Sequence, residues 1–300
     1  MKLPRHHYIP EFYLKQWAAP EDGRLFEFAR RYHKNVPKVV ARPTHPGGTG
    51  YVRGLNLMEA ATPELREQFE TVIMGTVDNR AQEALLKLKS DDNSPWLPKP
   101  RSSWTRFIIS LMFRNPEALE KIRSQIAKLP LLNSAEARAA YEQMAQPGAP
   151  DFDAYMREDV GAARFQFILS MMNQKSLGNR INNMIWQRCT FANSPYSVLT
   201  SDRPVIFWQV NGRQVIVVPT GPNTLFVAFH DYADFERLRS TPLKELIVKV
   251  NRHVVERAVR FVWGADTHNQ RFIENRLGAD NKNDLFYLDL ERAARGLEAA

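Results

Sequence analysis

The sequence contains a single cysteine, Cys189, among its 300 residues. One thiol cannot form an intrachain disulfide, and it cannot supply the paired cysteines of a two-cysteine zinc site. We therefore expect a protein of a reducing cytoplasm, in which Cys189 is a small core residue rather than a nucleophile.

Long apolar runs are missing as well. The longest, such as residues 107–113, are far shorter than the roughly 20 residues that a membrane-spanning helix needs. The N-terminus carries basic residues but lacks the apolar segment of a secretory signal. The expectation is a soluble cytoplasmic protein with no membrane partner.

The familiar catalytic motifs are absent too. The sequence holds no H-E-x-x-H, G-x-S-x-G, G-x-G-x-x-G or P-loop pattern, and its aromatic residues form no RNA-recognition box. The glycine-rich stretch HPGGTGYVRG at residues 45–54 lacks the lysine and hydroxyl residue of a P-loop, so we interpret it as a flexible loop. No single motif therefore indicates a reaction.

What is present is the composition of an ordinary globular protein, with 44% hydrophobic and 25% charged residues. The 41 basic and 33 acidic residues leave a formal charge of +8. This excess permits an anionic partner such as a nucleic acid or a nucleotide without requiring one. The basic residues are scattered, and groups such as Arg30 and Arg31 are typical of solvated faces.

Hydrophobic periodicity predicts an α+β fold in a single domain spanning residues 1–300. The expected parts are β-containing regions at about 20–55 and 195–230, a helical region at about 59–190, a late helix at 241–264 and a strand in the stretch NDLFYLDL at 283–290. Asn211-Gly212 is the strongest hairpin signal. The helical middle is expected to pack on one mostly antiparallel sheet built from N-terminal and C-terminal strands.

The stretch RHHYIPEFYLKQWA at residues 5–18, called the opening box below, raises a question of chemistry. Its aromatic residues fit one face of a short helix that docks the N-terminus on the core. His6 and His7 are adjacent, and neighbouring side chains do not face one metal ion in either a helix or a strand. At most one of them is therefore a candidate acid, base or ligand, and the alternative is a histidine bonded to local backbone.

The stretch TSDRPV at residues 200–205 supplies a second candidate. Pro204 favours extended geometry at Arg203 and places Ser201 and Asp202 at the end of a strand. Functional carboxylates often occupy such turns, but a side chain that bonds backbone amides in an Asx or Ser/Thr turn explains the same pattern.

Charged residues in the helical region complete the candidates. Glu67 and Glu70 lie on the first long helix, with Glu70 beside its apolar stripe, and Arg114 precedes the interruption Asn115-Pro116. They are either a structural ion pair or an anion site in which arginine binds phosphate and a carboxylate holds a metal ion or water. Asn251 interrupts the late helix and lies either at the surface or along a cleft.

These segments also resemble a bacterial family of unknown function, whose members share a His-His-x-x-Pro-type opening box and a Thr-Ser-Asp-x-Pro box. The matching segments are HHYIPEFYLKQWA, DGRLFEFAR, Glu70, FRNP at 113–116, TSDRPV and VNRHVVERAVRFVWG from Val250, in the same order from about His6 to Gly264. The resemblance implies one domain and no established activity. Arg203 departs from it, because a small or amide residue is more usual there, and pairing with Asp202 would weaken a metal-ligand role.

The combined expectation is a hydrolase that acts on a phosphodiester or nucleotide-type substrate through one polar cleft. His6 or His7 would be the general acid or base, Asp202 and Glu70 would bind a divalent metal ion or orient water, and Arg114 would bind phosphate. Ser201 and Asn251 would lie nearby. The alternative is a non-catalytic binding or interaction protein, in which the same residues form a structural polar network.

Overall fold

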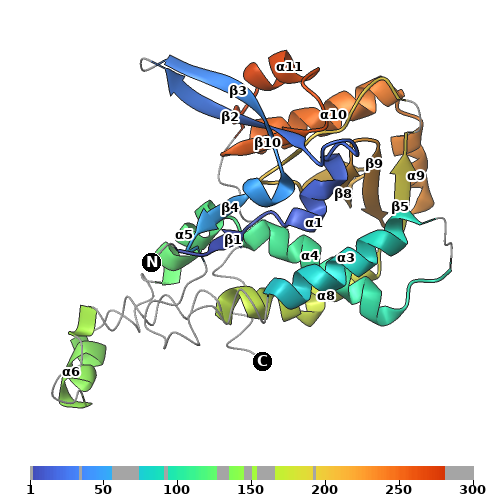
Figure 1. Ribbon diagram of the computed structural model, residues 1–300. Helices are drawn as coiled ribbons and strands as arrows, with labels where there is room; N and C mark the ends of the chain where they lie inside the picture. Colours follow the sequence, from blue (N-terminus) through green and yellow to red (C-terminus); the bar gives the residue numbers. More distant parts are fainter. Residues whose placement is uncertain are drawn as a thin grey trace.

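A computed structural model describes residues 3–33, 36–55, 74–90, 94–126, 135–144, 151–153, 166–191 and 194–280. The predicted α+β class is confirmed: helices combine with sheets whose described strand pairs are all antiparallel (Figure 1). The predicted strand at 283–290 and the first half of the predicted first long helix, including Glu67 and Glu70, lie outside the described residues. The single domain stays a prediction.

The elements follow one another in three groups. The N-terminal group comprises β1 (Arg5–His7), α1 (Glu11–Leu14), η1 (Lys15–Trp17), β2 (Leu25–His33), β3 (Val36–Thr44), η2 (Pro46–Gly48) and β4 (Tyr51–Arg53). The helical group comprises α3 (Gly75–Lys89), α4 (Pro98–Phe113), α5 (Pro116–Ile126), α6 (Ala135–Met144), helical residues 166–173 and α8 (Lys175–Asn182). The C-terminal group comprises β5 (Ile185–Thr190), β6 (Thr200–Ser201), β7 (Ile206–Val210), β8 (Arg213–Gly221), β9 (Thr224–Phe229), α9 (Tyr232–Arg239), α10 (Leu243–Arg257), β10 (Phe261–Gly264) and α11 (Gln270–Glu274).

The expectation of one sheet was wrong. The described strands form a ribbon of β1 and β4, a sheet in the order β3-β2-β10-β6 and a sheet in the order β5-β9-β8-β7. N-terminal and C-terminal strands do meet, because β10 pairs with both β2 and β6. The chain then leaves this sheet between Ser201 and Ile206, where Pro204 has no amide hydrogen to donate to a ladder.

Two apolar clusters lie on opposite faces of the two larger sheets. Along β8, Val215 and Val217 belong to one cluster, whereas Ile216 and Val218 belong to the other, as the two-residue period of a strand requires. The first cluster contains buried residues of α10, and the second contains those of α3, α4 and the opening box. Figure 1 shows α10 and the α3–α4 pair on opposite sides of the strands. The strands therefore form a middle layer covered on both faces.

Two boundaries of the predicted helices were wrong. The helical region ends at Asn182 and not near residue 190, because the β-branched and aromatic residues Ile185 and Trp186 begin strand β5, which pairs with β9. The late helix ends at Arg257 and not at residue 264, because Ala258 is extended and residues 261–264 form β10. Phe261 fits the apolar stripe of the helix by spacing but belongs to this strand.

The hairpin at Asn211-Gly212 is confirmed. It joins β7 to β8, and the two residues have φ angles of 51° and 74°. A two-residue turn with positive φ at both positions matches the right-handed twist of the flanking strands, and asparagine followed by glycine adopts it at low cost.

The opening box docks on the core as expected, although only Glu11–Leu14 is α-helical and residues 5–7 form strand β1. Its aromatic side chains Tyr8, Phe12, Tyr13 and Trp17 are all buried. The hydroxyl of Tyr13 donates to Pro219 O at 2.7 Å and accepts from Thr200 at 2.9 Å, and Trp17 Nε1 donates to Val198 O at 2.8 Å. These bonds attach the N-terminus to chain segments about 180 to 200 residues away.

We predict that Tyr13→Phe lowers the free energy of unfolding by about 1–3 kcal/mol, because it leaves the buried Pro219 carbonyl without its donor. Chemical denaturation followed by fluorescence measures the change. Tyr8→Phe is the matched control: the Tyr8 hydroxyl is buried without a hydrogen-bond partner among the described residues, so its removal is expected to be neutral or stabilising. Equal losses in both variants would contradict this account of the docking.

Candidate functional site

The two adjacent histidines point to opposite faces of strand β1. His6 pairs with Val52 and His7 with Tyr51 of β4, so their side chains alternate across the ribbon. His6 is buried at 1% exposure, whereas His7 is half-buried and packs edge-on against the Tyr51 ring at 5.5 Å. The geometry agrees with the expectation that the two rings do not face one ligand together.

His7 keeps one ring nitrogen unused. Burial lowers the pKa of His7, and the charge of Arg114 lowers it further, while Glu11 and a hydrogen bond to the Gly47 backbone oppose the shift. The Nε2 atom is buried and has no hydrogen-bond partner among the described residues. A neutral imidazole with one nitrogen free is chemically able to accept a proton or to bind a ligand.

Arg114 is paired within the fold. At 3% exposure, it binds both oxygens of Asp78 on α3, with Nη1–Oδ1 at 2.7 Å and Nη2–Oδ2 at 3.0 Å. Nη2 also donates to the backbone oxygen of His7 at 2.7 Å. The guanidinium thus joins α4, α3 and β1, and Asp78 occupies the edge that a phosphate would use. The structural alternative explains these contacts.

Asp78 is not among the acidic candidates predicted from the sequence for the first long helix, which are Glu67 and Glu70. Asp78 precedes the buried residues Ala81 and Leu85 by three and seven positions, so it lies on the apolar face of α3. An acid on that stripe predicts a cationic partner, although the pattern does not say which cation.

Asp202 lies where the sequence places it, at the end of a strand, but its oxygens are occupied. The side chain is 1% exposed and accepts hydrogen bonds from the amides of Val259 at 3.0 Å, Arg260 at 2.5 Å and Phe261 at 3.2 Å. Burial raises the pKa of Asp202 to about 6, while these amide bonds oppose the rise. The carboxyl group therefore organises the connection between α10 and β10.

Tyr8 lies in the electrostatic field of Asp202 and of further charges. Burial raises the pKa of the Tyr8 hydroxyl, and the carboxylates of Asp202, Glu117 and Glu27 add to this rise while Arg260 opposes it. Arg260 is ion-paired with Glu117, with Nε–Oε1 at 2.5 Å. The phenol makes no hydrogen bond to these groups among the described residues, so their influence on it is electrostatic. From the sequence, Tyr8 is predicted only as a core aromatic residue of the opening box.

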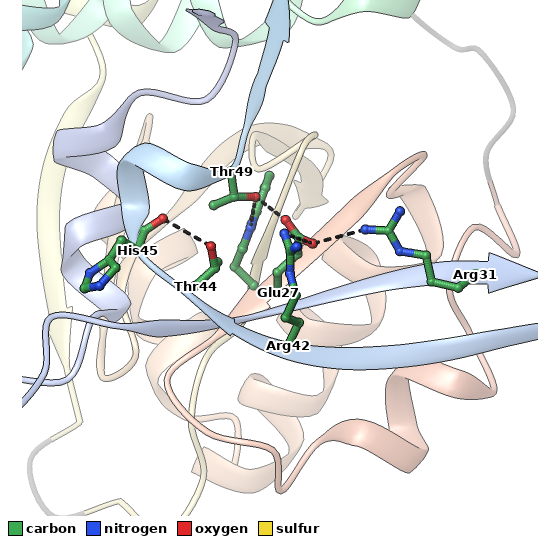
Figure 2. Close-up of polar contacts among 7 residues, drawn as sticks. Glu27, Arg31, Arg42, Thr44, His45 and Thr49 are labelled. Atoms are coloured by element: carbon green, nitrogen blue, oxygen red, sulfur yellow. Dashed lines mark hydrogen bonds and ion pairs between the residues drawn. The ribbon is translucent and has the colours of Figure 1, made fainter.

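A second buried carboxylate, Glu27, was also missed (Figure 2). It is 2% exposed and accepts from Thr49 Oγ1 at 2.5 Å and from Arg42 Nη2 at 3.2 Å, with Arg31 Nη2 at 3.6 Å. Trp263 Nε1 donates to Thr49 at 3.0 Å and extends the network into β10. The sequence does hold a signal for this buried acid, because Glu27 stands among the apolar residues Leu25, Phe26 and Phe28 of the predicted strand.

Ser201 and Asn251 have structural contacts. Ser201 Oγ accepts from the Arg203 amide at 3.1 Å, as in a Ser/Thr turn. Asn251 accepts from the Leu199 amide at 2.8 Å and donates to Ser197 O at 2.9 Å, so both ends of its amide bind backbone. Burial lowers the pKa of Arg203, and the charge of Asp202 opposes that shift.

The structure therefore joins Arg114 to the backbone of His7, while Asp202 binds the amides after α10 and Asn251 is bonded to the segment before β6. Among the described residues, no three His, Cys, Asp or Glu side chains are arranged to hold a metal ion. The metal role predicted for Asp202 with Glu70 stays a prediction, since Glu70 is outside the described part. No described helix is long and apolar enough to cross a membrane.

Comparison of the sequence with known protein families identifies one match. A family described as "Protein of unknown function (DUF4238)" matches residues 5–268. The chain belongs to the DUF4238 family. This range contains the opening box, Arg114 and the Asp202 turn, in agreement with the resemblance seen in the sequence. No curated protein and no solved structure matches this DUF4238 chain.

We predict that the stability contributed by Asp202 depends on pH. Its folded pKa of about 6 lies above the unfolded value of about 3.9, so the folded state binds the proton more tightly and gains stability as the pH falls. Relative to Asp202→Asn, the wild-type protein should gain about 2 kcal/mol between pH 7 and pH 4. Denaturation of both proteins at each pH measures this difference, and a difference that shrinks or stays constant would refute the assignment.

Proposed function

We propose that this protein binds nucleic acid through the hairpin formed by β2 and β3. The hairpin extends beyond its sheet: β10 pairs only with Phe26–Ala29, whereas the β2–β3 ladder continues to His33 and Val36. Figure 1 shows this part projecting from the body of the molecule. Val39 is still buried against the body, but residues 30–32 and 36–38 of the far half are exposed.

The charge of the hairpin supports an anionic partner and carries the proposal. Between Leu25 and Thr44 the sequence has five basic residues, Arg30, Arg31, Lys34, Lys38 and Arg42, and one acidic residue, Glu27. Glu27 is buried under Arg31 and Arg42, so the exposed charge is cationic. Phosphate groups are the polyanion that such a surface attracts.

The shape of the hairpin suits the same partner. A two-stranded β-ribbon fits the major groove of a duplex, and exposed aromatic rings stack on unpaired bases. Arg31 lies directly opposite Lys38 in the ladder, which puts two cations on one rung. Tyr32 is 73% exposed and Val36 is 64% exposed near the far end. By the two-residue period of a strand, the Arg31–Lys38 rung and the Tyr32 ring lie on opposite faces of the ribbon, so one face offers cations and the other an aromatic ring.

The interior supports binding over catalysis. Arg114, Asp202 and Asn251 direct their polar groups to other parts of the fold, as a structural network predicts. The exposed cationic surface lies on the β2–β3 hairpin and not beside these three residues.

We predict that Arg31→Gln with Lys38→Gln weakens binding to a DNA duplex by at least about 10-fold at moderate salt and reduces the slope of log K against log salt by about 2. Fluorescence anisotropy with labelled duplex and single-stranded DNA measures both. The matched control is Lys175→Gln with Arg237→Gln, which removes the same charge from exposed positions on α8 and α9. Equal weakening by both pairs would indicate a general charge effect and overturn the proposal.

A hydrolase is the second candidate, favoured by one observation. His7 Nε2, Tyr8 Oη and Arg114 Nε are buried and lack hydrogen-bond partners among the described residues. Unsatisfied buried polar atoms are uncommon in folded proteins and occur at sites that receive a ligand or water. In this proposal His7 is the general base toward a phosphodiester.

If the hydrolase proposal is correct, the protein cleaves DNA or RNA with Mg²⁺ or Mn²⁺, and His7→Ala lowers the rate by about 100-fold or more without loss of fold. Because the lowered pKa keeps His7 neutral at neutral pH, activity should be flat there and fall only in acid. Gel assays with circular dichroism of each variant measure this. Absence of cleavage by the wild-type protein would remove the enzyme candidate.

A further inference from the structure

A separate cavity lies among three helices. Its described lining comes from Thr76, Val77 and Arg80 of α3, Ser103 and Arg106 of α4, and Leu169, Met172 and Asn173 of the helical residues 166–173. Its volume is about 220 Å³. Helices α3 and α4 pack side by side in this part of the molecule (Figure 1). None of the candidate residues discussed above lines the cavity.

The helical period explains why these residues share a cavity. Thr76 and Arg80 are four positions apart on α3, and Ser103 and Arg106 are three positions apart on α4, so each pair lies on one helix face. Asp78 lies about 160–200° around α3 from Arg80 and turns to Arg114 instead. Helix α3 thus presents an acid to the core and a cation to the cavity.

Two arginines, Arg80 and Arg106, line this cavity without a neutralising partner among the described residues. Neither Arg80 nor Arg106 has an ion pair or hydrogen bond with any described residue, and the described lining contains no Asp or Glu. Arg106 is half-buried and Arg80 is exposed, which gives solvent access. Like charges around a partly desolvated cavity repel each other unless an anion lies between them.

The other lining residues define what accompanies the anion. Asn173 offers an amide group, whereas the Ser103 hydroxyl already donates to Lys99 O at 2.9 Å; Val77, Leu169 and Met172 offer apolar surface. The volume is below the roughly 300–1,000 Å³ of cavities that hold drug-sized molecules. A ligand of few atoms, with an anionic group and a small apolar group, matches this lining.

We propose that this cavity is a binding site for a small phosphate monoester with an apolar substituent. Two arginines supply two positive charges and planar donor pairs, which suit a dianionic phosphate better than a single carboxylate. The apolar side chains receive the substituent. The site is independent of the hairpin surface, and neither proposal rests on the other.

Isothermal titration calorimetry of the full chain tests the site with phenyl phosphate, inorganic phosphate and benzoate as probes. Phenyl phosphate should bind more tightly than the other two, because only it has both the dianion and the ring. Arg80→Gln and Arg106→Gln should each weaken its binding by at least about 10-fold, as expected for loss of a charged hydrogen-bonding partner. Arg237→Gln, an exposed arginine of α9, should leave it unchanged.

Three results would overturn the proposal: no binding of phenyl phosphate to the wild-type protein, tighter binding of benzoate, or equal affinities of the wild-type and both arginine variants. Circular dichroism establishes that each variant is folded. The variant with Arg31→Gln and Lys38→Gln tests whether the two proposed sites are independent. It should bind phenyl phosphate as tightly as the wild-type protein does, even if its binding to DNA is weakened.

Discussion

The carboxylate of Asp202 is the constraint on which much of the architecture depends. By accepting the amides of residues 259–261, it takes over backbone donors that would otherwise lack partners just after α10. The chain therefore leaves the helix and enters β10. That strand pairs with β2 on one side and with β6 on the other, so it unites the N-terminal and C-terminal parts of the sheet. A buried acid with three amide donors is thus explained by the fold alone.

The opening box and the hairpin depend on the same face of one sheet, because Thr200, Trp263 and Glu27 are directly paired across its strands. Thr200 of β6 bonds Tyr13, and Trp263 of β10 bonds Thr49, whose hydroxyl reaches Glu27 at the base of the hairpin. The base is therefore anchored by buried polar contacts, while the far half has no neighbouring strand among the described elements. A base anchored in this way presents the cations of the exposed end without burying them, which agrees with the proposed binding of a large anionic partner.

The sequence predicts elements that local chemistry specifies and misses those that distant residues decide. Asn211-Gly212 carries its own turn geometry, and the alternation after Asp22-Gly23 identifies β2. Phe261, by contrast, fits a helical stripe, and its strand conformation depends on distant partners: Asp202, 59 residues away, accepts its amide, and Ala29 of β2 pairs with it. The candidate site shows the same limit: Arg114 was predicted to need a partner, but α3 packing decided that the partner is Asp78. For Glu27 the sequence signals a buried acid, but its partners Thr49 and Arg42 are known only from the fold.

Arg114 and Arg80 differ in one respect: the guanidinium of Arg114 is paired with a carboxylate of the fold, and that of Arg80 is not paired with any described residue. A buried arginine must find a carboxylate, because an unpaired charge in the interior costs several kcal/mol, and Arg114 finds Asp78. Arg80, two positions after Asp78, is under no such demand, since it faces solvent and a cavity shared with Arg106. Neutralising it inside the fold would need a carboxylate on that face, and the described lining has none. The same helix therefore carries a charge used for folding and a charge left for a ligand.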